Sequence, residues 1–226
     1  MYKIIYSWHI LSRIYPYIIL SLLLLNCVPD SIHAQNKAMD QVLISKFKLR
    51  VKELALETQT ITSNFQQDKE MSMISERIIS KGKFYFRKER MLRWEYIDPF
   101  SYVIIINNDR ISVKDENNVN HFNVSSNKVF VEINRIILGS IQGTLLNDEK
   151  NFKTFFFDSP ASYVVKLYPS AANLKESLSE IVIYFDHKDF SVDQVEMIEP
   201  GGDKTRITFH NKIFNKPVAD EKFSVQ

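Results

Sequence analysis

Apolar and polar positions alternate with two different periods along this chain of 226 residues. Between Asn36 and about Thr58, apolar residues recur every three or four positions, as on one side of a helix. This stripe consists of Met39, Leu43, Phe47, Val51 and Leu54. We therefore expect one amphipathic helix over this segment.

After this segment the period changes to two. The alternation is clearest at Leu92, Trp94 and Tyr96, which would share one face of a strand, with Arg93 and Glu95 on the other. The pattern predicts short strands at Ile61–Lys69, Ser75–Ser80, Gly82–Lys88, Met91–Tyr96, Ser101–Asn107, Arg110–Lys114, Val119–Val124, Phe152–Phe157, Ser162–Tyr168, Glu180–Asp186, Gln194–Ile198 and Thr205–Asn211. Because most connections are too short for crossover helices, we expect antiparallel hairpins.

One strongly apolar segment, Asn127–Leu146, interrupts the strands and predicts a second helix, and Ala171–Leu178 predicts a helical turn. About ten or eleven antiparallel strands with two or three helices indicate a mainly β (α+β) fold. A sheet of that length must close, split or have one face covered. We expect an incomplete barrel, or half-barrel, with an α-helical lid, formed by residues 35–226 as a single domain.

The N-terminal segment predicts export. Ile18–Leu25 is a short apolar run that follows Lys3 and Arg13 and precedes the small residue Ala34. This order is typical of a cleaved signal peptide over residues 1–34, with a retained anchor as the alternative. Cys27, the only cysteine of the chain, would then be lost, which leaves no thiol for disulfide, metal or nucleophilic chemistry.

Composition and motifs argue against catalysis. The chain has 29 basic and 27 acidic residues, so its net charge of +2 predicts no general affinity for nucleic acid. His121, His187 and His210 lack the spacing of metal ligands, and Asp186–Asp189 fits a charged turn. No nucleophile elbow, phosphate loop or dinucleotide fingerprint occurs. We expect a protein that is not an enzyme.

Residues 82–99 are the most informative segment. A glycine begins a strand, a basic turn follows, and then come Leu92-Arg-Trp-Glu-Tyr96 and Pro99. This order resembles the periplasmic outer-membrane lipoprotein carrier (LolA-like) family. Asn64–Gln67 resembles its Phe-x-Gln strand, Ile136–Thr144 its middle helix and Asn215–Phe223 its closing element.

The resemblance implies an incomplete barrel with a helical lid and an apolar cavity for acyl chains, without cofactor or metal. The candidate cavity residues are Phe84, Phe86, Leu92, Trp94, Tyr96, Ile104, Ile106, Phe47, Val51, Leu54, Ile133 and Ile137. The alternative is that they form an ordinary core. A regular pleat would place the first five on one face.

The resemblance also implies a latch between the sheet and its lid. Members of the family carry Arg-Pro after the strand that begins with glycine, whereas this chain has Lys88 and Glu89, with Arg87 adjacent. A lysine lacks the planar fork with which arginine bonds several carbonyls at once. Lys88 and Arg87 are therefore the candidate latch residues.

The implied partners are acylated lipoproteins, an inner-membrane ABC release complex, and an outer-membrane receptor or the outer membrane itself, with the carrier expected to be a monomer in the periplasm. The alternative is an envelope-stress sensor, because similar half-barrels occur in regulators of anti-sigma factors. Such regulators usually carry a further C-terminal domain, which we do not expect after Phe223. A lipid hydrolase is disfavoured by the missing nucleophile motif.

Overall fold

The computed structural model describes residues 36–74, 76–88, 91–107, 110–115, 119–123 and 128–224. The predicted signal peptide and Cys27 lie outside the described residues. Residues 36–226 form one compact unit. Within the described ranges, no helix has the length and apolar character needed to span a membrane.

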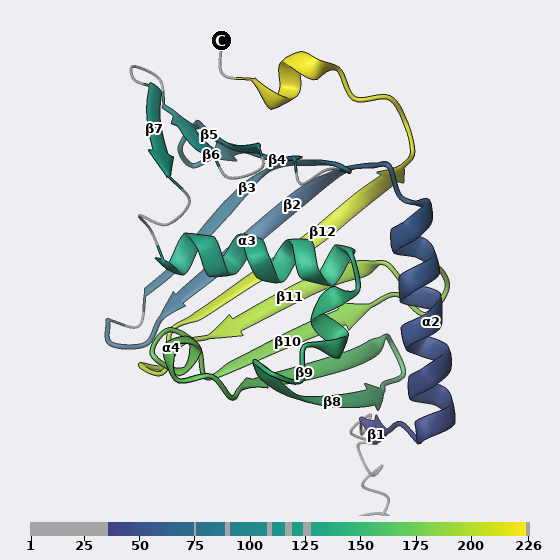
Figure 1. Ribbon diagram of the computed structural model, residues 1–226. Helices are drawn as coiled ribbons and strands as arrows, with labels where there is room; N and C mark the ends of the chain where they lie inside the picture. Colours follow the sequence, from purple (N-terminus) through teal and green to yellow (C-terminus); the bar gives the residue numbers. More distant parts are fainter. Residues whose placement is uncertain are drawn as a thin grey trace, which may run out of the picture. The chain divides into compact units, whose positions relative to one another are not determined.

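The unit is built on one antiparallel sheet of twelve strands, which confirms the predicted fold class (Figure 1). The strands are β1 (Lys37–Ala38), β2 (Thr60–Met71), β3 (Glu76–Arg87), β4 (Met91–Asp98), β5 (Tyr102–Asn107), β6 (Arg110–Lys114), β7 (Val119–Asn123), β8 (Phe152–Asp158), β9 (Tyr163–Pro169), β10 (Glu180–Phe185), β11 (Val192–Ile198) and β12 (Lys204–Phe214). Their order in the sheet is β1-β8-β9-β10-β11-β12-β2-β3-β4-β5-β6-β7. The end strands β1 and β7 do not pair, so the barrel is not closed.

Two runs of consecutive hairpins, β2–β7 and β8–β12, meet where β12 pairs with β2. Phe209 lies opposite Phe65 in this pairing. Beyond His210 a bulge shifts the register, and Asn211 adopts a positive φ of 54°. Such a bulge bends a strand and redirects its side chains.

The helices lie against one face of this sheet. They are α2 (Gln41–Glu57), α3 (Lys128–Ile141) and α4 (Ala172–Lys175), with a single 3₁₀ turn η3 (Thr144–Asn147) after α3. A second 3₁₀ turn, η4 (Asp220–Phe223), belongs to the closing segment. Since α3 follows the edge strand β7 and precedes β8 near the other edge, it must cross the sheet. Figure 1 shows α3 in front of β12 and β11, and α2 beside the ends of the later strands.

The first helix begins later than the sequence pattern predicts. Asp40 is its N-cap, and its carboxylate accepts a hydrogen bond of 2.8 Å from the backbone N–H of Leu43. The residues before it are not helical, because Lys37 and Ala38 pair as β1 with Asp158 and Phe157.

Two other predicted boundaries are also corrected. The segments Ser75–Ser80 and Gly82–Lys88 belong to the single strand β3, because β2 pairs with it continuously from residue 60 to residue 71. The helix predicted to extend to Leu146 ends at Ile141, since Gly143 adopts a left-handed conformation with φ of 66° and starts a separate turn.

Aromatic side chains form much of the core on the face covered by the helices. Phe65, Phe84 and Trp94 come from three adjacent strands, and the Trp94 ring lies 5.0 Å and 4.6 Å from the other two ring centres. A second cluster surrounds Phe47 of α2, whose ring lies 5.1 Å from that of Phe185. Packed aromatic pairs of this kind add to the free energy gained by burial.

The closing segment returns along the opposite face of the sheet. After β12, Asn215 accepts a hydrogen bond of 2.7 Å from the backbone N–H of Gln59. The turn η4 then lies against β4 and β5 and buries Phe223. Arg93 donates a hydrogen bond of 3.2 Å to the carbonyl of Lys222, which fixes the turn to β4.

Gly82, which opens the informative segment of the sequence, lies where two neighbouring strands approach each other closely. A Cβ atom at this position would overlap the carbonyl oxygen of Glu95 and lie 2.8 Å from Cε1 of Phe65. Only glycine fits such an approach, and the β3–β4 register shifts between Lys81 and Gly82.

We therefore expect Gly82→Ala to lower the free energy of unfolding by about 3 kcal/mol, because the overlap involves backbone as well as a packed ring. Gly201→Ala is the matched control, since a Cβ atom there meets nothing within 4 Å. Urea unfolding of both variants measures the difference. Equal stabilities would contradict the proposed steric role of Gly82.

Candidate functional site

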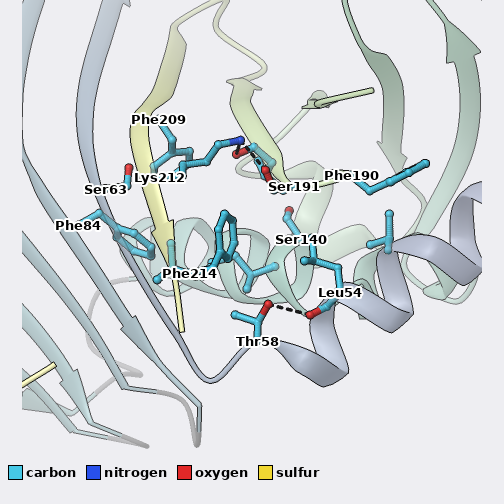
Figure 2. Close-up of a pocket in the computed structure, with 14 residues that line it drawn as sticks. Leu54, Thr58, Ser63, Phe84, Ser140, Phe190, Ser191, Phe209, Lys212 and Phe214 are labelled. Carbon is cyan, nitrogen blue, oxygen red and sulfur yellow. Dashed lines mark hydrogen bonds between the residues drawn. The ribbon is translucent and has the colours of Figure 1, made fainter. Parts of the chain in front are cut away.

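The candidate site is an apolar pocket between the helix-covered face of the sheet and the two long helices (Figure 2). Its walls come from α2, from α3 and from strands β2, β3 and β12, together with the segment that leads into β11. The pocket is lined by Val51, Leu54, Thr58, Ile61, Ser63, Phe84, Ser140, Ile141, Phe190, Ser191, Val192, Phe209, Lys212 and Phe214. Its polar groups are few and consist of hydroxyls and one ammonium.

The free space in this pocket is only about 30 Å³. Pockets that hold drug-sized ligands usually measure roughly 300–1,000 Å³. The helices are therefore packed down on the sheet in this structure. A chain of methylene groups could enter only if α2 or α3 moved away from the sheet.

One charged side chain lines the pocket. The β12 bulge turns Lys212 inward, where its Nζ donates a hydrogen bond of 2.5 Å to Ser191 Oγ and forms an ion pair with Asp193. Figure 2 shows Lys212 beside Ser191 and near Phe209. Because these partners neutralise the ammonium, the pocket remains an essentially apolar site.

The structure places the predicted cavity residues on the covered face, but only some of them line the pocket. Phe84, Val51 and Leu54 do so. Buried beside it are Phe86, Leu92, Trp94, Tyr96, Ile104, Ile106, Phe47 and Ile137. Ile133 belongs to α3, but its side chain lies outside the described part of the structure.

A buried hydrogen bond joins the sheet to α3. Trp94 Nε1 donates to Asn134 Oδ1 over 3.2 Å, and both side chains are buried. A buried amide without such partners would cost about 1–3 kcal/mol. The bond therefore favours the position of α3 over the β4 strand.

Tyr96 closes the other end of the aromatic face. Its hydroxyl donates a hydrogen bond of 2.9 Å to Gln67 Oε1, and its ring stacks on Tyr102 at 4.2 Å. Burial raises the pKa of the Tyr96 phenol far above its usual value, so the group stays neutral.

The two candidate latch residues point in different directions. Lys88 Nζ donates a hydrogen bond of 3.0 Å to the carbonyl oxygen of Leu56, in the last turn of α2. Arg87 instead forms an ion pair with Asp220 and lies over the ring of Phe223, 4.5 Å from its centre. Lys88 thus contacts α2, whereas Arg87 holds the closing segment on the opposite face.

Several pocket residues were not among the sequence candidates. Phe209 and Ile61 follow the alternation of β12 and β2, so their direction could have been inferred once the covered face was known. The sequence carries no comparable signal for Phe190 and Lys212. Phe190 has a positive φ of 61° after the β10 turn, and Lys212 depends on the β12 bulge.

Side chains of the types that hold metals are not grouped in the described part of the fold. Throughout the described ranges, no three His, Cys, Asp or Glu side chains lie close enough to hold a metal ion. The chemistry of the described pocket is accordingly that of apolar contact with a few hydroxyl groups.

Comparison with known proteins supports the family inferred from residues 82–99. The model of the family described as outer membrane lipoprotein carrier protein LolA matches residues 56–226. Among curated protein sequences, none matches the chain.

Several solved structures are similar to this chain. A LolA superfamily protein from Nitrosomonas europaea is 7% identical, with a TM-score of 0.42 over 80% of this chain and 97% of that one. The lipoprotein LppX from Mycobacterium tuberculosis is 12% identical, with a TM-score of 0.44 over 80% and 99%. MucB is 10% identical, with a TM-score of 0.51 over 82% of this chain and 63% of MucB. Of these three, the likeness to MucB bears on the fold, and at 10% identity it bears on the fold alone.

The bond between Trp94 and Asn134 can be tested by a double-mutant cycle. We expect Trp94→Phe to destabilise the protein by about 1–3 kcal/mol and to speed amide exchange in α3, because it leaves the Asn134 oxygen without this donor. Adding Asn134→Leu should recover part of the loss, as both partners are then apolar. Purely additive effects would show that the two residues are not coupled.

Proposed function

Because the chain belongs to the LolA family of outer membrane lipoprotein carrier proteins, we propose that it binds the acyl chains of lipoproteins and carries them from the inner to the outer membrane. The predicted signal peptide supports the periplasm as the site of this activity. In this proposal an inner-membrane ABC release complex supplies the cargo. An outer-membrane receptor, or the outer membrane itself, accepts it, and the carrier works as a monomer.

The observation that carries the proposal is the apolar pocket beneath two helices on an unclosed sheet. Burial of hydrocarbon is worth about 0.8 kcal/mol per methylene, so a chain of sixteen carbons requires roughly 12 kcal/mol of shelter from water. An exposed patch leaves one side of such a chain hydrated. A space between sheet and helices encloses it.

Loading requires the helices to move, because about 30 Å³ of free space cannot hold an acyl chain. The apolar sides of α2 and α3 now occupy the place that cargo would take. Opening would break the Lys88–Leu56 and Trp94–Asn134 hydrogen bonds, and the acyl chains would replace the lost apolar contacts. Cargo and lid would therefore compete for the same face.

Cargo binding can be tested with two substitutions on the same helix. Leu54 of α2 lines the pocket, whereas Leu49 of α2 faces solvent. We expect native mass spectrometry of the periplasmic protein to show a bound triacylated polypeptide. Leu54→Glu should abolish this complex, since it places a carboxylate in the pocket, and Leu49→Glu should preserve it.

Two results would contradict the proposal. One is a protein that co-purifies only with free phospholipid, or with no lipid at all, while lipoproteins reach the outer membrane normally in depleted cells. The other is a Leu54→Glu variant that folds and retains its cargo as well as Leu49→Glu does.

The proposed latch has its own test. Lys88→Met removes the ammonium that caps the end of α2, so we expect faster amide exchange in the last turn of that helix. The loss of stability should be at most about 1 kcal/mol, because the bond is exposed to water. Lys83→Met, in an exposed position of the strand β3 that precedes Lys88, is the control. Unchanged exchange in α2 would show that Lys88 does not secure it.

A further inference from the structure

Half of the exposed large apolar side chains of the described residues gather at one end of strands β2–β5. This apolar tip consists of Met73, Ile74, Ile78, Ile79, Ile97 and Phe100. Met73 is 95% exposed and Phe100 is 74% exposed. Single exposed apolar residues are common on protein surfaces, but a group of this size marks an interaction site.

Strand register places the six residues of the apolar tip along the same end of the sheet. Lys81 pairs with Asp98, so Ile79 and Phe100 each lie two residues beyond that pair, on the same side of it. The β2–β3 pairing continues to Met71 and Glu76, five residues further, which extends the hairpin by about 17 Å past the end of β4. Figure 1 shows this turn at the opposite end of the strands from α2.

The turn at the end of the hairpin is braced. The backbone N–H of Ser72 donates a hydrogen bond of 2.9 Å to Asp203, and its hydroxyl donates one of 2.7 Å to the carbonyl of Gly201. Both partners belong to the turn between β11 and β12. The exposed side chains of Met73 and Ile74 are thus carried on a supported turn.

The apolar side chains point in several directions. Ile78 and Ile79 are consecutive in a strand, so they lie on opposite faces of the hairpin, while the others belong to its end and to the neighbouring turn. A single protein surface would cover one of these faces. A lipid phase would surround the whole tip.

Basic side chains near the apolar tip also favour a lipid bilayer as its partner. Lys81 and Lys83 share the outer face with Ile79 and lie about 7 Å and 13 Å from it along the strand. Both are exposed, and neither forms an ion pair with any part of the chain that the structure describes. Two ammonium groups at these distances from Ile79 match a layer of anionic phosphates above the acyl chains.

Charged residues and unpaired backbone groups near the apolar tip limit how deeply it can enter a bilayer. Glu70 and Glu76 flank the turn, and Asp98 precedes the second turn. The β3 edge from Glu76 to Ser80 has no β4 partner, so its backbone groups need water. Contact is therefore confined to the interfacial region, roughly 5–10 Å deep.

We propose that the apolar tip docks on the surface of a lipid bilayer, with Met73, Ile74 and Phe100 entering the boundary between headgroups and acyl chains. The inference goes beyond cargo binding, because the tip shares no residue with the pocket. It would hold the protein at a membrane while the pocket stays free to load or release.

Co-sedimentation of the purified protein with vesicles of phosphatidylcholine and phosphatidylglycerol tests this proposal. The triple variant Met73→Ser, Ile74→Ser and Phe100→Ser should lower the vesicle partition coefficient at least about tenfold. The matched control is Val42→Ser, Leu49→Ser and Leu56→Ser, which removes three exposed apolar side chains from α2. Its vesicle binding should equal that of the unmodified protein.

Two further variants sharpen the test. Phe100→Trp should give a blue shift of tryptophan emission when vesicles are added, since the ring leaves water. Replacing Lys81 and Lys83 by Gln should weaken binding to vesicles that contain phosphatidylglycerol, without affecting those of phosphatidylcholine alone. Both results are expected at an unchanged unfolding midpoint.

Three outcomes would overturn the proposal. The first is an unmodified protein that does not sediment with either kind of vesicle. The second is a tip variant that binds vesicles as well as the α2 control does. The third is a tip variant that still binds vesicles but no longer binds a protein partner that pairs with the free β3 edge. Native mass spectrometry of the tip variant distinguishes a failure of this proposal from a failure of the proposed function. The variant should still bind cargo, because the tip shares no residue with the pocket.

Discussion

A long antiparallel sheet with one apolar face must keep that face out of water, and most of this structure follows from that constraint. The sheet does not close, because β1 and β7 lie at its two ends. Its aromatic side chains can therefore be buried only by segments from outside the sheet. The helices α2 and α3 supply this cover, and α3 does so because it connects the two edges. The pocket lies where sheet and cover meet.

In the described part of the structure, polar side chains connect the cover to the sheet at several points. Trp94 bonds Asn134 of α3 and Lys88 bonds the end of α2. Lys48 of α2 and Arg135 of α3 lie over the rings of Phe156 and Phe152. Apolar contacts are not directional, so an acyl chain could replace the apolar side chains of the helices, while Trp94 and Asn134 would exchange their hydrogen bond for other partners. This makes a cover that is stable when empty compatible with one that yields to a hydrocarbon ligand. Because apolar side chains of the helices and the sheet pack closely against one another, the free space of the pocket is small in this structure.

The opposite face and the far end of the sheet make contacts of other kinds than the face covered by α2 and α3. Arg87 and Arg93 fix the closing segment against the outer face, so the end of the described chain adds to the stability of β3 and β4. The hairpin of β2 and β3 extends past this support and carries apolar side chains into solvent. Its exposed residues contribute little to the core, which is consistent with a role in contact with another phase.

The sequence by itself determined most of the strands, the antiparallel class and the covered face around Trp94, because side chains alternate along a strand whatever lies beside it. It did not predict β1, and it divided β3 in two. It also singled out Gly82. Why a glycine is needed there is seen only in the structure, where Glu95 and Phe65 approach it closely. Tertiary structure alone decided that β12 joins β2, that α3 crosses the sheet, and that Lys88 rather than Arg87 meets α2. It likewise placed Lys212 and Phe190 at the pocket. These features depend on pairing between distant segments, on a bulge and on turn geometry, none of which leaves a periodic signal in the chain.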